Sequence, residues 1–307
     1  MVLATIGVFE FFKGWLLYGA LGRAVIAFGD SGHYLYREGN VRAMASVEHS
    51  IVLGFVMVIA LGFFLFLRES ITNRIVRGLW LALLLAGLIA PQSRGPWIGA
   101  VILFLVFIAT GPRAARRILV LIAGGIIATP LILVSPIGEK MYSYLPFVGT
   151  VEQENVTYRQ LLIENCFKLI KQNPFIGVPN AMETTELQSM RQGSQGIIDI
   201  VNSYVSIALG SGLIGLLLFV SIFTTIGFGI YKCMEQVAGK NEELHLLGRV
   251  LLATLVAIMV MIGTVSSISF IPVIYWSVAG IGLAYIRMVT KNNVAALSGC
   301  RNIIPAN

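Results

Sequence analysis

Long uninterrupted stretches of apolar residues decide what this chain can fold into. Residues 47–67, 200–230 and 246–265 each reach the roughly 18–20 residues that a helix needs to cross the hydrocarbon core of a membrane. They lack the alternation of apolar and polar residues that marks a membrane-spanning strand. Helices satisfy their own backbone hydrogen bonds in lipid, so the sequence predicts an all-α bundle of transmembrane helices.

The composition agrees with a membrane protein. The 307 residues are 57% hydrophobic and only 12% charged, whereas a soluble domain carries about 25% charged residues. The net charge of +7 sits mostly in short loops, which indicates membrane orientation and argues against nucleic acid as a partner. Cys166, Cys233 and Cys300 lie far apart and match no metal or redox spacing, so neither a metal nor a cofactor is expected.

The apolar and polar stretches divide the chain into five parts. The expected parts are a partial transmembrane helix with a periplasmic or interfacial stretch at 1–46, four transmembrane helices at 47–134, a large periplasmic loop at 135–199, three transmembrane helices at 200–290 and a cytoplasmic tail at 291–307. The spans are expected at about residues 47–67, 78–90, 97–110, 118–134, 200–230, 246–265 and 270–287. The first apolar run is too short to span, which leads us to expect that the chain is truncated at its amino terminus.

Lysine and arginine residues set the expected orientation. Three alternate loops carry three of them each, namely Arg68, Arg74 and Arg77, then Arg113, Arg116 and Arg117, then Lys232, Lys240 and Arg249. The short loops between them carry only Arg94. Because positively charged loops stay in the cytoplasm, the 135–199 loop is expected to face outward.

One segment of this loop has the periodicity of an amphipathic helix. Residues 158–172 place apolar residues at helical spacing, and these are Leu161, Leu162, Cys166, Leu169 and Ile170. Asn173 and Pro174 then predict the end of the helix.

Several charged residues near the outward ends of the spans are candidates for binding or chemistry. Arg94 lies in a tight outward turn, where it either reaches lipid phosphate or recognises an anionic head group. Arg42 precedes the first full span together with Arg37, Glu48 and His49, and His49 is either structural or a general base.

The loop and the helix that follows it supply the other candidates. Arg159 and Arg191 are either anion binders or solvated charges. Asp199 is either a cap for the fifth span or, with Asn202 and Tyr204, part of a site at the membrane boundary. Glycines at 210, 212 and 215 are expected to allow close helix packing.

Five short motifs occur in an order that resembles the superfamily of O-antigen ligases and polysaccharide polymerases. They are Ser93-Arg94-Gly95-Pro96-Trp97, Tyr158-Arg159, Asn173-Pro174-Phe175-Ile176-Gly177-Val178, Asn202-Ser203-Tyr204-Val205 and Leu213-Ile214-Gly215-Leu216-Leu217-Leu218-Phe219. The resemblance covers about residues 35–290.

The resemblance implies a metal-independent glycosyltransferase in the bacterial inner membrane. Its donor would be a glycan on undecaprenyl diphosphate, and its other partners would be membrane lipids and membrane proteins of polysaccharide assembly. Arg94 and Arg159 match the arginines thought to hold the diphosphate, with Arg42 and Arg191 as further candidates. Developing negative charge on a leaving diphosphate is what fixed guanidinium groups stabilise.

Four interpretations of function remain open. Ligases typically carry His before the Asn of the fourth motif, whereas this chain has Val201 before Asn202. The difference favours a polymerase that joins repeat units of O-antigen or exopolysaccharide, with Asp199 or His49 as base. The alternatives are a ligase that transfers glycan to lipid A-core or another acceptor, and a transporter of lipid-linked sugars or an inactive fragment.

Overall fold

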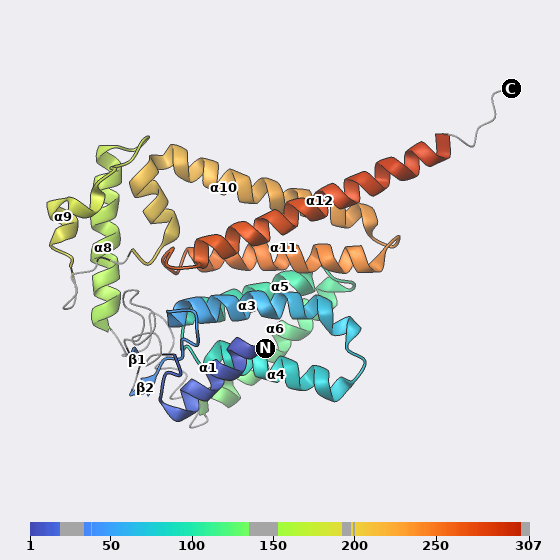
Figure 1. The fold of residues 1–307 in the computed structure, drawn as a ribbon, viewed down its shortest axis with the longest axis horizontal. Helices are drawn as coiled ribbons and strands as arrows, with labels where there is room; N and C mark the ends of the chain where they lie inside the picture. The colour runs from blue at the N-terminus through green and yellow to red at the C-terminus, as the bar shows by residue number, and fades with distance from the viewer. Residues whose placement is uncertain (19–33, 38, 135–152, 192–197, 199, 302–307) are drawn as a thin grey trace. The chain divides into compact units, whose positions relative to one another are not determined.

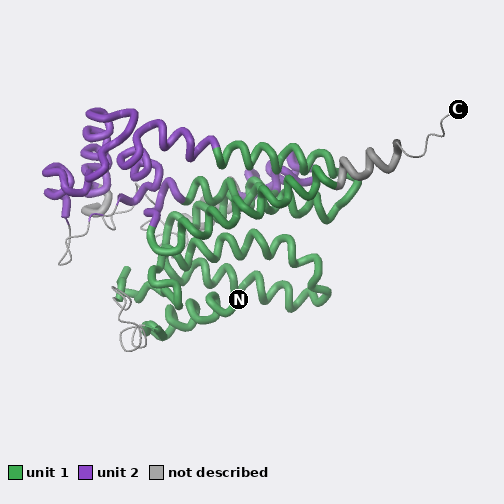
Figure 2. Tube along the Cα trace, turned by 45° about the horizontal axis from the view of Figure 1, so that its top comes forward, with its two compact units in different colours: residues 1–107, 222–261, 268–307 green, residues 108–221, 262–267 purple. Residues whose placement is uncertain are grey.

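The structure is a computed structural model that describes residues 1–18, 34–37, 39–134, 153–191, 198 and 200–301 (Figure 1). Helices make up most of it, which confirms the all-α fold class expected from the sequence. In the described part of the chain, strands are limited to β1 (Tyr36–Arg37) and β2 (Asn40–Val41), which pair antiparallel. The chain forms two compact units (Figure 2): residues 1–107, 222–261 and 268–307, and residues 108–221 and 262–267.

The first unit is built from long apolar helices. They are α1 (Val2–Lys13), α3 (Ser50–Leu67) with the short η1 (Arg68–Ser70), α4 (Arg74–Ile89), α5 (Arg94–Ala109), α11 (Glu242–Ile262), α12 (Ile271–Arg301) and the second part of α10 (Ser203–Val237). Glycine lets these helices approach closely. A Cβ on Gly62 of α3 would lie 2.2 Å from Oγ1 of Thr254 in α11, and a Cβ on Gly99 of α5 would lie 2.4 Å from Cγ of Met261.

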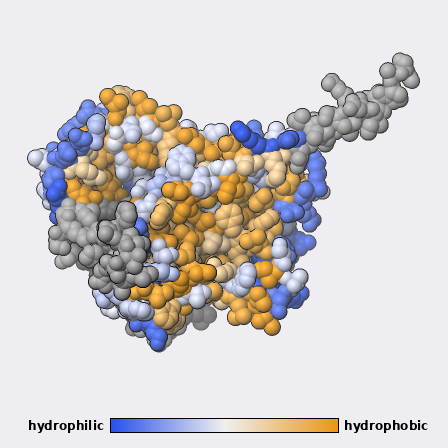
Figure 3. All heavy atoms as spheres, viewed as in Figure 1, coloured by the Kyte–Doolittle hydropathy of each residue, from blue (hydrophilic) through white to orange (hydrophobic). Residues whose placement is uncertain are grey.

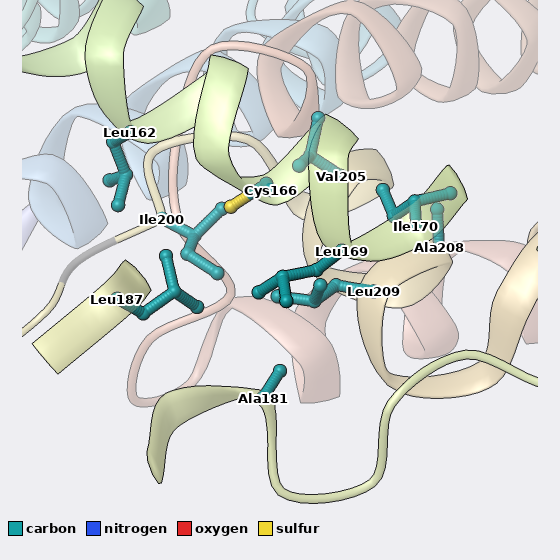
Figure 4. Close-up of a cluster of buried hydrophobic side chains, with 10 residues drawn as sticks. All are labelled: Leu162, Cys166, Leu169, Ile170, Ala181, Leu187, Ile200, Val205, Ala208 and Leu209. Atoms are coloured by element: carbon teal, nitrogen blue, oxygen red, sulfur yellow. The ribbon is translucent and has the colours of Figure 1, made fainter. Parts of the chain in front are cut away.

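The second unit contains the helices of the loop. They are α6 (Ala114–Val134), α8 (Gln153–Gln172), η2 (Ala181–Glu183), α9 (Thr185–Gln188) and the first part of α10. Figure 4 shows the apolar cluster that they bury, which consists of Leu162, Cys166, Leu169, Ile170, Ala181, Leu187, Ile200, Val205, Ala208 and Leu209. The loop cluster therefore joins α8 to the beginning of α10.

A helix lies in each stretch for which the sequence predicts a transmembrane span. Within the described residues, four helices are long and apolar enough to cross a membrane: Ser50–Ser70, Ser203–Val237, Glu242–Ile262 and Ile271–Lys291. Apolar side chains are widely exposed on the surface drawn in Figure 3, as expected for helices that face lipid. On α10, for example, Leu217 is 69% exposed.

The structure corrects three details of the sequence analysis. Leu161 is 47% exposed, so it does not share the buried face of α8 with the other apolar residues. Arg249 does not belong to a loop, because it lies within α11 and is buried. There its Nη2 donates to the carbonyl oxygen of Phe107 at 2.6 Å, and its guanidinium lies 4.2 Å from the centre of the Phe107 ring.

The third correction concerns α10, which is not one continuous helix. Gly212 interrupts it with φ 67° and ψ −174°, a conformation open essentially to glycine alone. A Cβ on Gly210 would meet nothing within 4 Å, and a Cβ on Gly215 would meet only Ser211 of the same helix. Of these three glycines, Gly212 alone allows another segment to approach, and that segment is not a helix.

Candidate functional site

The turn between α4 and α5 is tightly built. Gln92 adopts the left-handed conformation with φ 50°, and both Gln92 and Ser93 are buried. The indole Nε1 of Trp97 donates to the carbonyl oxygen of Leu88 at 3.0 Å, which ties the start of α5 to the end of α4. Arg94 opens α5 and is half-buried, with its Nε and Nη2 atoms shielded from solvent. The turn thus holds the Arg94 guanidinium in a partly desolvated position.

Two further arginines reach this turn from the hairpin of β1 and β2. Arg42 donates from Nε to the carbonyl oxygen of Pro91 at 3.0 Å and from Nη2 to Oγ of Ser93 at 2.8 Å. Arg37 donates from Nη1 to the carbonyl oxygen of Gln92. We call Arg37, Arg42 and Arg94 the arginine turn. Arg42 and Arg94 were candidates from the sequence, whereas Arg37 was noted only as a neighbour of Arg42.

A buried carboxylate fixes the chain that leads into α3. Glu10 of α1 is fully buried, and its Oε2 accepts the backbone N–H groups of Met44 at 2.9 Å and Ala45 at 2.8 Å. Its Oε1 accepts the N–H of Leu17 at 3.0 Å. Glu10 was not among the candidates from the sequence, although an acidic residue within an apolar run was the available signal.

His49 has a structural task at the start of α3. It is the N-cap residue, and its Nδ1 accepts the N–H of Ile51 at 3.1 Å. Because Nδ1 acts as acceptor, the proton of the neutral ring sits on Nε2, which is then a donor and no base. This geometry favours the structural role over the catalytic one.

The second unit carries the loop candidates Arg159 and Arg191, and both side chains are exposed. The hydroxyl of Tyr158 donates to the carbonyl oxygen of Met190 at 2.8 Å. Each residue of that pair directly precedes one of the two arginines. The hydrogen bond therefore holds the segments that carry Arg159 and Arg191 next to each other.

Asn202 caps α10. Its Oδ1 accepts the N–H groups of Tyr204 at 3.0 Å and Val205 at 3.2 Å. Asn202 thus takes the capping position directly before Ser203, where the helix begins; Asp199 lies outside the described residues. Tyr204 is half-buried, and its ring meets the edge of Phe219 at 6.3 Å between ring centres.

The break in α10 is filled by residues 173–178, which we call the clasp segment. The N–H of Val178 donates to the carbonyl oxygen of Leu209 at 2.7 Å, and the N–H of Leu213 donates to the carbonyl oxygen of Pro174 at 2.8 Å. The clasp segment therefore satisfies backbone groups that the broken helix leaves open. A Cβ on Gly212 would lie 2.1 Å from the carbonyl oxygen of Phe175, so the contact requires glycine.

The loop cluster also contains a thiol, which belongs to Cys166 of α8. Cys166 is fully buried, and burial raises its pKa to about 11 because the thiolate would lose its hydration. Such a thiol is inert at neutral pH. Across the described residues, no three His, Cys, Asp or Glu side chains come together as a metal site would require.

The part of the chain that carries most of these features is similar to a known protein family. Residues 78–220 match the family model described as O-antigen ligase. This segment is similar to the O-antigen ligase family. The resemblance stated from the sequence motifs is thereby confirmed. The O-antigen ligase segment contains Arg94, Arg159, the clasp segment, Asn202 and the break in α10. The family match supports a membrane function of the ligase or polymerase type. A search of curated proteins found no match.

Proposed function

We propose that the protein is a polymerase-type glycosyltransferase that joins repeat units carried on undecaprenyl diphosphate, in the assembly of O-antigen or exopolysaccharide. The observation that carries this proposal is the arginine turn. Two guanidinium groups donate to the oxygens of one short turn, and Arg94, which follows that turn, lies within the O-antigen ligase segment. Guanidinium groups bind phosphate oxygens in a bidentate manner and keep their charge at every physiological pH.

The members of the arginine turn have different tasks in this proposal. Arg42 and Arg37 donate to backbone and hydroxyl oxygens of the turn, so we assign them to positioning. Arg94 binds the donor diphosphate, because its partial burial strengthens attraction to an anion. Arg159 and Arg191 stand exposed on adjoining segments, and we propose that they also bind the donor.

The chemistry is a substitution at the sugar carbon that carries the diphosphate. An acceptor hydroxyl oxygen forms the new bond to this anomeric carbon, and the bond from the carbon to the diphosphate oxygen breaks. The electron pair leaves with undecaprenyl diphosphate, whose growing charge the guanidinium groups stabilise. We propose that the hydroxyl proton passes to the carboxylate of Asp199, since His49 is engaged as a cap.

Asn202 and Tyr204 are proposed to orient the sugar or the carrier. The Oδ1 of Asn202 is already occupied by two backbone N–H groups, so its amide nitrogen would make the contact. Val201 supports a polymerase over a ligase, because ligases of the resembling superfamily typically carry His at the position before this Asn. A ligase remains the second candidate, since the family match supports both activities.

The test is to delete the gene in its host and to analyse the glycans that remain on the undecaprenyl carrier. Wild type, Arg94→Lys and the control Arg116→Lys are returned on plasmids, and Arg116 is an exposed residue of α6. Lysine keeps the charge but loses the bidentate contact, so Arg94→Lys should slow chain growth by roughly 10- to 100-fold. Membrane insertion of all three proteins is checked by blotting the membrane fraction.

The glycans that accumulate separate the candidate functions. A polymerase leaves single repeat units on the carrier after deletion, whereas a ligase leaves finished long chains. Unchanged carrier-linked glycans would refute both. Equal restoration by Arg94→Lys and Arg116→Lys would remove Arg94 from the proposed site.

A further inference from the structure

A second cationic feature lies in the first unit, away from the arginine turn. A cavity of about 440 Å³ opens where α3 and η1 end and α4 begins, and Phe104 of α5 also lines it. This volume is within the roughly 300–1,000 Å³ of small-molecule sites. The first half of α4 lines the cavity, whereas Arg37 and Arg42 contact the residues that follow the other end of α4. The two ends of α4 are about 24 Å apart, at 1.5 Å per residue over 16 residues.

The charge of the cavity is positive. Three arginines line it, Arg68, Arg74 and Arg77, against one carboxylate, Glu69. Arg68 is paired with Glu69, with 3.4 Å between Nε and Oε1. Within the described residues, the side chains of Arg74 and Arg77 form neither a hydrogen bond nor an ion pair. Two cationic groups therefore line the cavity and are available to an anionic occupant.

The rest of the lining is apolar. Phe64, Leu81 and Phe104 line the same cavity as the arginines. The cavity also includes the end of α3, and the candidate membrane span that contains this helix ends at Ser70. A site at the end of a span lies at the level of lipid head groups. An occupant must therefore combine an anionic group with a hydrocarbon part, and a soluble phosphate would leave the apolar lining unused.

We propose that this cavity binds an anionic phospholipid of the leaflet on the arginine-rich side of the membrane. The phosphodiester lies between Arg74 and Arg77, and an acyl chain lies against Phe64 and Phe104. Basic pockets between membrane helices take such head groups. The site is separate from the arginine turn and does not depend on the function proposed above.

The test measures lipid retention on the purified protein by native mass spectrometry, with dioleoyl-phosphatidylglycerol and dioleoyl-phosphatidylcholine as probes. The pocket variant is Arg74→Gln/Arg77→Gln. The matched control is Arg116→Gln/Arg117→Gln, which removes the same charge from two exposed arginines in the first turn of α6. Each arginine near an anionic head group contributes about fivefold to binding. The pocket variant should therefore retain phosphatidylglycerol roughly 25-fold less well, and the control should retain it as wild type does.

A second variant blocks the cavity without changing its charge. Gly78 lines the cavity, and a Cβ placed on it would meet nothing within 4 Å, so Gly78→Trp should fold and fill the space. It should lose phosphatidylglycerol although all three arginines remain. Equal loss in the pocket and control variants would overturn the proposal in favour of general surface charge. Retention by Gly78→Trp, or displacement of the lipid by soluble glycerol phosphate, would also overturn it.

Discussion

Replacing Gly212 with alanine should release the clasp segment from α10. At φ 67° and ψ −174° an alanine is strained, and its Cβ would lie 2.1 Å from the carbonyl oxygen and 2.2 Å from the carbonyl carbon of Phe175. Both atoms belong to the backbone, so no side-chain rotation relieves the overlap. The clasped state must therefore open rather than adjust.

The contacts of the clasp segment give the change in the free energy of its opening. Opening loses the hydrogen bond from Val178 to Leu209 and the one from Leu213 to Pro174, each contributing about 1 kcal/mol. Holding alanine in the conformation of Gly212 costs the clasped state about 1–3 kcal/mol, and the overlap of its Cβ with the backbone of Phe175 adds to this cost. Because opening relieves this strain, the alanine should make opening easier by about 3 kcal/mol, which offsets both hydrogen bonds and is roughly a 100-fold rise in the open population.

Cys166 provides the assay, because it is fully buried in the loop cluster together with Leu209. In a background that carries Cys233→Ser and Cys300→Ser, the rate of maleimide labelling reports how often this cluster opens. Gly212→Ala should label on the order of 100-fold faster than its parent. The matched control is Gly210→Ala, since a Cβ on Gly210 meets nothing within 4 Å.

The labelling rates of Gly212→Ala and Gly210→Ala are compared to test this reasoning. If Gly212→Ala labels no faster than Gly210→Ala, then α10 tolerates a Cβ at residue 212 and the clasp does not hold the loop cluster closed. A straightened α10 that keeps Cys166 protected would refute the reasoning in the same way.

Two further predictions concern buried ionisable groups. Glu10→Gln should lower the free energy of unfolding by about 3 kcal/mol, because an amide nitrogen would face the N–H groups of Met44 and Ala45. Thermal unfolding in detergent checks this, and the exposed control Glu69→Gln should change stability by less than about 1 kcal/mol. The second prediction concerns Cys166, whose pKa of about 11 means that the folded state keeps the thiol proton between pH 9 and 11 while the unfolded state releases it. Stability should therefore fall as pH rises through this window, and Cys166→Ser should remove this part of the pH dependence in chemical denaturation.

Hydropathy predicted the helices well because lipid leaves the backbone few alternatives. Every stretch expected to span the membrane contains a helix, and the pattern at 158–172 correctly predicted a helix at the end of α8. The pattern was less exact about faces: it placed Leu161 with the buried residues, although this side chain is 47% exposed. A residue at the edge of an apolar stripe is buried or exposed according to its neighbours, which the pattern does not contain.

The break in α10 could not be predicted in the same way. The apolar residues continue across Gly212, so a hydropathy window sees one helix. The break exists because residues far earlier in the sequence supply the missing hydrogen-bond partners. The sequence singled out Arg94 as a cation in a turn expected to face outward, whereas the contact of Arg37 with Gln92 depends on how the hairpin packs.

The composition of the loop cluster means that the large loop is not a separable domain. Six of its ten buried residues come from residues 162–187, but Ile200, Val205, Ala208 and Leu209 follow the loop. During synthesis, α8 therefore cannot bury its apolar face until the start of α10 has been translated. The loop expressed alone would leave that face in water, so antigens or crystallisation fragments cut from this protein should extend through Leu213.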